Sequence, residues 1–92
     1  MKIKIIAIPP DNAPPNIAAK WLNVEMECLQ PGDNLYDAVF HRFYQVTCQE
    51  VLRCLKEHDR EAYEYWLNYF KSTPNGINNV LCFKAESCEE VS

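Results

Sequence analysis

Residues 46–71 read VTCQEVLRCLKEHDREAYEYWLNYFK, and this stretch decides the fold because it predicts two helices in succession. Thr47 and Glu50 have the spacing of a capping box. In such a box the threonine hydroxyl accepts a hydrogen bond from the glutamate amide, and the glutamate carboxylate reaches back to the cap. Val46 and Val51 stand at the two hydrophobic staple positions around it. The first helix is therefore expected to begin directly after Thr47.

The second helix follows the first with almost no connection between them. The first is expected to run to about Glu57, and Asp59 then caps a helix over residues 60–71, REAYEYWLNYFK. Pro74 and Gly76 are breakers that end this second helix. The two helices therefore form a helical hairpin.

Four segments outside the hairpin have the composition of strands. They are residues 2–8 (KIKIIAI), 21–29 (WLNVEMECL), 40–46 (FHRFYQV) and 79–85 (NVLCFKA). In the first two, apolar and polar residues alternate, which is typical of a half-buried strand. Residues 88–92, CEEVS, are interpreted as an acidic tail.

A stiff, proline-rich connector joins the first two strands. Pro9 and Pro10 end the first strand, and Pro14 and Pro15 start a short helical turn. No two of these four prolines have the three-residue spacing of a PxxP ligand. The segment is therefore expected to serve as a connector and not as a recognition motif.

Residues 1–92 are expected to form a single compact α+β domain, because a chain of this length buries enough surface for one hydrophobic core. The order β-β-β-α-α-β favours a small antiparallel or mixed sheet, either open or curled toward a barrel. The helical hairpin would cover the open face of this sheet.

Charge and hydropathy exclude several classes of partner. The net charge is −4, and the nine Lys and Arg are scattered, so no basic surface for nucleic acid is expected. No apolar segment approaches the roughly 20 residues of a membrane helix, and the N-terminus lacks the features of a signal peptide. We expect a soluble, cytoplasmic protein whose five cysteines are reduced.

The cysteines and histidines suggest one incomplete metal site. Cys54 and His58 lie one helical turn apart, which is the spacing of two zinc ligands on one helix. No second pair of ligands completes the site, so we expect no metal and no other cofactor. The alternative is that Cys54 flanks the core and His58 lies at a helix C-terminus, where the dipole favours a cation.

Cys48 is the candidate for a reactive thiol. It occupies the first helical position after Thr47, where backbone amides can lower a thiol pKa, and His41 is the one conceivable base. The same residue also belongs to the apolar stripe of its helix, so the alternative is a buried structural thiol. That stripe consists of Cys48, Val51, Leu52 and Leu55.

Tyr65 and Tyr69 form a second contact face on the second helix. The apolar stripe of this helix is predicted to consist of Tyr63, Trp66, Leu67 and Phe70. The two tyrosines lie off that stripe and one turn apart, and tyrosine is enriched at protein interfaces. The alternative is that both pack along the hairpin or lie exposed.

Two hypotheses about function follow. The first is a non-enzymatic binding or interaction module that self-associates as a dimer, or binds a protein partner, through the tyrosines. The second is a small-molecule-binding protein or small enzyme with a pocket between the sheet and the hairpin. That pocket would be lined by Tyr36, His41, Tyr44 and Cys48.

The chain as a whole resembles a class of small bacterial proteins. The features concerned are the strand ending in Ile8, Pro9 and Pro10, then Ala13-Pro14, Trp21 leading a strand, and the closing CFKAESCEEV. These features resemble the uncharacterised proteins that integrons and other mobile gene cassettes carry. The resemblance implies a compact α+β domain, bacterial and cytoplasmic, and it carries over no activity and no site residues.

Overall fold

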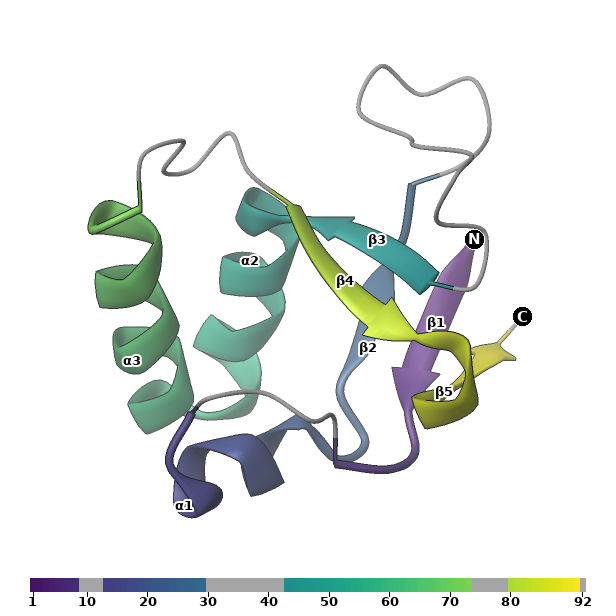
Figure 1. The fold of residues 1–92 in the computed structure, drawn as a ribbon, viewed down its shortest axis with the longest axis horizontal. Coiled ribbons are helices and arrows are strands. Elements are labelled where there is room, and N and C mark those ends of the chain that lie inside the picture. Colours follow the sequence, from purple (N-terminus) through teal and green to yellow (C-terminus); the bar gives the residue numbers. More distant parts are fainter. Residues whose placement is uncertain (9–12, 30–42, 74–79, 92) are drawn as a thin grey trace.

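The computed structural model describes residues 1–8, 13–29, 43–73 and 80–91 (Figure 1). The strands and helices are β1 (Lys2–Ile5), α1 (Pro15–Ala18), β2 (Glu25–Glu27), β3 (Phe43–Thr47), α2 (Cys48–His58), α3 (Arg60–Lys71), β4 (Val80–Lys84) and β5 (Cys88–Val91). Two short 3₁₀ turns, η1 (Ala19–Trp21) and η4 (Ala85–Ser87), follow α1 and β4. The predicted α+β class is confirmed.

The strands form two small antiparallel sheets instead of the single sheet expected. One sheet has the order β2-β1-β5, and the other pairs β3 with β4. Because β1 is paired on both sides, β3 and β4 have no place beside it. The amide of Leu29, beyond β2, donates to the carbonyl of Gln45 on β3 at 2.8 Å and so links the two sheets. Within the described residues, neither sheet closes into a barrel.

The segment predicted as an acidic tail is strand β5, which is a correction. In its pairing with β1, Lys4 lies opposite Glu89 and Ile5 lies opposite Cys88. On the other side of β1, Lys4 lies opposite Glu25. Opposite charges across neighbouring strands stabilise a sheet. The acidic composition of β5 therefore favours a strand once β1 lies beside it, which the segment alone does not reveal.

β2 begins later than predicted. Trp21 lies in η1, and Asn23 has a φ of 71°, a left-handed conformation that asparagine tolerates and that interrupts the strand. From this point the predicted alternation is confirmed, because every second side chain is buried. These side chains are Val24, Met26 and Cys28.

β1 also ends earlier than predicted, at Ile5. The amides of Ile6 and Ala7 both donate to the carbonyl of Ser87 in η4, at 2.8 and 3.3 Å. The chain thus leaves the sheet after Ile5, and the side chain of Ile6 is exposed. The helical turn predicted after the prolines is present as α1.

The helical hairpin is confirmed, including both N-terminal caps. The amide of Glu50 donates to the Thr47 hydroxyl at 3.2 Å, and the amide of Ala62 donates to the Asp59 carboxylate at 3.0 Å. The reciprocal half of the capping box is not formed as expected. The Glu50 carboxylate accepts instead from the amide of Glu27 on β2, at 2.7 Å.

The core lies between the hairpin and the two sheets. In Figure 1, α2 lies between α3 and the sheets, and α1 lies across one end of the hairpin. The ring of Trp21 contacts Trp66 of α3 at 5.4 Å between centroids and Phe83 of β4 at 5.0 Å. One aromatic side chain from η1 thus joins the helical hairpin to the β3–β4 sheet.

Candidate functional site

Tyr65 and Tyr69 lie one turn apart on α3, and both contact the ring of Trp66. The centroid distances are 5.2 and 5.3 Å, and the interplanar angles of 83° and 73° describe edge-on contacts. Trp66 is buried, Tyr65 is half-buried, and Tyr69 is 46% exposed. We call Tyr65 and Tyr69, with Trp66 beneath them, the aromatic face of α3. Its two tyrosines form the outer layer of a cluster whose inner layer is the core.

The apolar stripe of α3 is centred differently from the prediction. Trp66 and Phe70 are buried as expected, but Tyr63 and Leu67 are only half-buried, whereas Ala62 is buried. The centre of the stripe is thus displaced around the helix toward the aromatic face. Both tyrosines therefore lie beside the buried stripe, with Tyr65 half-buried and Tyr69 exposed.

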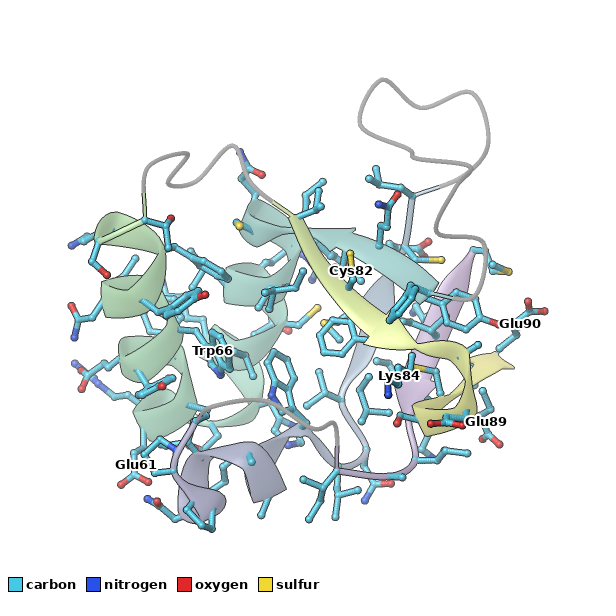
Figure 2. The ribbon with its side chains drawn as sticks, viewed as in Figure 1. Glu61, Trp66, Cys82, Lys84, Glu89 and Glu90 are labelled. Atoms are coloured by element: carbon cyan, nitrogen blue, oxygen red, sulfur yellow. The ribbon has the colours of Figure 1, made fainter. Side chains whose placement is uncertain are left out.

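Polar residues bound the aromatic face at both ends. At the α1 end, the Glu61 carboxylate accepts from the side-chain amide of Asn16 at 3.1 Å (Figure 2). At the other end, the Ser72 hydroxyl donates to the carbonyl of Tyr69 at 2.9 Å. A polar rim around an aromatic centre is typical of protein interfaces.

The indole nitrogen of Trp66 is buried and has no hydrogen-bond acceptor among the described residues. An unpaired buried N–H group costs about 1–3 kcal/mol. The ring contacts of Trp66 with its aromatic neighbours offset this cost, since edge-on pairs contribute about 0.5–1.5 kcal/mol each beyond their buried area.

Tyr44, the other described tyrosine of the predicted site, lies apart from the aromatic face. It is on β3, and its hydroxyl donates to the carboxylate of Glu90 on β5 at 3.1 Å. Burial, and after it the hydrogen bond to Glu90, raises the pKa of Tyr44 above its ordinary value. Tyr44 therefore links the two sheets within one chain. Tyr36 lies outside the described residues.

Cys48 is fully buried at the start of α2, and its exposed fraction is 0%. Val51, Leu52 and Leu55 of the predicted stripe are also buried, so this stripe is confirmed. A thiol in this position packs as a small apolar group. His41, its proposed base, lies outside the described residues.

Cys54 and His58 both line a cavity between α2 and β2. The Cys54 Sγ lies 3.6 Å from a carboxylate oxygen of Glu50 and 3.4 Å from Nη2 of Arg53. Burial, together with the charge of Glu50, raises the pKa of Cys54 to about 11, so the thiol stays protonated at neutral pH. Within the residues that the structure describes, no three His, Cys, Asp or Glu side chains gather to hold a metal ion.

This cavity was not found by sequence reasoning. It lies between a helix and the edge of a strand, and it depends on which strand occupies the edge. The one local signal was the Cys54–His58 spacing, which placed both residues on the correct side of α2 but suggested a metal.

No protein-family model, curated protein or solved structure matches the chain. The resemblance to cassette-encoded proteins therefore stays a prediction. None of the described helices is both long and apolar enough to span a membrane.

Proposed function

We propose that this protein is a non-enzymatic interaction module that associates with a second copy of itself through the aromatic face of α3. The observation that carries the proposal is the exposure of Tyr69 beside the buried Trp66. One edge of this large aromatic side chain already packs on the core, so the side chain loses little conformational entropy when its other surface binds a partner. Tyrosine in such a position is enriched among residues that dominate binding energy.

A second copy suits this face because its two tyrosines are self-complementary. In a two-fold symmetric contact, residue i of one chain meets residue j of the other, and j meets i. Tyr65 and Tyr69 are separated by four residues, or about 6 Å along the helix axis. If two copies of α3 pack antiparallel about an axis between the tyrosines, Tyr65 of each chain meets Tyr69 of the other.

Four of the five described thiols support a role without catalysis, and the fifth, Cys82, is exposed on β4. Cys28, Cys48, Cys54 and Cys88 are buried. Burial raises the pKa of Cys88 to about 11, as it does for Cys54, and a protonated thiol is a poor nucleophile. These groups contribute to packing, whereas the aromatic face has free surface.

Light scattering coupled to size-exclusion chromatography tests the proposal. Wild-type protein is expected to have twice the mass of the 10.7 kDa chain, and Tyr65→Ser/Tyr69→Ser is expected to have the mass of one chain. Glu64→Ser/Asn68→Ser is the matched control, since it has the same spacing on an exposed part of the same helix. Circular dichroism shows that each variant is folded. A monomeric wild type, or a tyrosine variant that stays dimeric, contradicts the proposal.

A further inference from the structure

Helix α2 lies along the open edge of β2 (Figure 1). The amide of Ile5 donates to Val24 at 3.0 Å, and that of Cys28 donates to Met1 at 2.9 Å. In an antiparallel pair, hydrogen-bonding residues alternate with residues whose backbone groups point away. The amides and carbonyls of Glu25 and Glu27 therefore face α2.

A side chain of α2 bonds the backbone of one of these two residues. The amide of Glu27 donates to the Glu50 carboxylate at 2.7 Å. Two residues along a strand span about 6.7 Å, and four residues along a helix span about 6 Å. The step from Glu27 back to Glu25 on β2 therefore covers nearly the same distance as the helical turn that follows Glu50 on α2. Glu25 thus comes beside Cys54, one turn after Glu50.

At this second position the chain leaves a cavity of about 310 Å³. This volume is at the lower end of the range for small-molecule sites. The backbone groups of Glu25 have no hydrogen-bond partner in the described part of the chain. The lining residues are Lys2, Val24, Glu25, Arg53, Cys54, Glu57 and His58.

Charged side chains of both signs line the cavity, and three of them form no ion pair with a described residue. Lys2, Glu25 and Glu57 form no ion pair with another described residue. Arg53 is held by Glu50 through Nε at 2.8 Å and Nη2 at 2.9 Å, which leaves Nη1 without a described partner. Two cations and two carboxylates thus line one space, and Arg53 is the one of these four that a described residue, Glu50, already pairs. A simple anion or a simple cation would meet charges of its own sign there.

We propose that this cavity binds a small zwitterion of the amino-acid class, with its carboxylate at Lys2 and Arg53 and its ammonium group at Glu25 and Glu57. Such a ligand pairs charges of both signs at once. Its carboxylate and ammonium groups can also bond the outward amide and carbonyl of Glu25. The Cys54 thiol is protonated and lies against Glu50, so binding is non-covalent. The site is separate from the aromatic face of α3, and it does not depend on self-association.

The test is an NMR titration of the full chain with ω-amino acids, from glycine to 6-aminohexanoate. These probes differ only in the distance between the two charges. We expect saturable shifts at the amides of Glu25, Cys54 and His58, with one length binding best. Hexanoate and hexylammonium, which carry one charge each, are expected to bind at least tenfold more weakly. Shifts that do not saturate, that lie elsewhere, or that the singly charged compounds reproduce overturn the proposal.

Matched variants test which residues of the cavity bind the carboxylate of the ligand and which bind its ammonium group. Lys2→Gln and Glu57→Gln are each expected to weaken the best probe about two- to fivefold, as for a partly exposed ion pair. Lys84→Gln on β4 and Glu64→Gln on α3 change exposed residues outside the cavity lining, and both variants are expected to bind as wild type does. Equal weakening by these two controls, or no weakening by the first two variants, contradicts the placement of the charges.

Discussion

At the scale of single residues, Glu50 shows how a local signal acquires a second role. Its amide completes the Thr47 cap, which the sequence predicts because both partners lie within one helical turn. Its carboxylate bonds the amide of Glu27, 23 positions away along the chain. No local pattern indicates which strand edge will lie beside α2, so this second contact could not be predicted.

Glu50→Gln is expected to lower the free energy of unfolding by about 1 kcal/mol near neutral pH, since a hydrogen bond to a charged acceptor is stronger than one to a neutral acceptor. Burial raises the pKa of Glu50, but the bonds from Arg53 and the Glu27 amide outweigh it, so the pKa lies below the ordinary 4.5. A lowered folded-state pKa stabilises the fold above the unfolded-state pKa, and this contribution disappears as pH falls. Urea unfolding should therefore show wild type and variant converging below about pH 4.5.

The control for this prediction is Glu57→Gln. Glu57 is exposed on the same helix and forms no ion pair with another described residue. We expect the free energy of unfolding of Glu57→Gln to match that of wild type from neutral pH to below about pH 4.5. A difference between wild type and Glu50→Gln that persists in acid, or that is absent at neutral pH, contradicts the role assigned to Glu50.

The cysteines are expected to differ sharply in reactivity. Cys82 is exposed on β4, whereas the other four are buried (Figure 2). A thiol reagent should modify one cysteine rapidly in the folded protein and the remaining four only after denaturant is added. Cys82→Ser should remove the rapid phase. Rapid modification of Cys48 in that variant would contradict its burial and restore the hypothesis of a reactive thiol.

At the scale of elements, prediction succeeds where the signals are local. The hairpin helices begin at caps within the segment itself, and α2 and α3 begin at the predicted residues. Strands depend on neighbours that are distant in sequence. β5 was missed because Glu89 and Glu90 look like a solvated tail until Lys4 is placed opposite Glu89. β2 was predicted too long because a left-handed Asn23 cannot be recognised from an alternating pattern.

Replacing Glu89 by proline tests β5. In the described register, Lys4 and Glu89 are opposite one another, and β1 turns its even-numbered residues toward β5. Glu89→Pro removes the amide that pairs with Lys4, so we expect a loss of about 1–3 kcal/mol in unfolding free energy beyond that of Glu89→Ala. The alanine variant removes the same side chain and keeps the amide. Equal stability of the two variants would contradict pairing at this position.

At the scale of the whole molecule, Trp21 shows what sequence could not predict. It was placed at the start of a strand, but it lies in η1, where it contacts α3 and β4 at once. Contacts among three segments decide how the hairpin sits on the sheets. Trp66, which the ring of Trp21 contacts, also carries the edge-on contacts of Tyr65 and Tyr69. The tyrosine pair was found by helical spacing, and its contacts with Trp66 lie within one turn of α3. The contact of Trp66 with Trp21 follows from the assembled fold.

Self-association through the aromatic face of α3 is the central claim, and isotope-filtered NOE spectroscopy tests it most directly. Labelled and unlabelled wild-type chains are mixed, and only contacts between different chains are recorded. We predict cross-peaks from the ring of Tyr65 in one chain to the ring of Tyr69 in the other. Cross-peaks that join other surfaces, or their absence in a sample that light scattering shows to be monomeric, would contradict the claim.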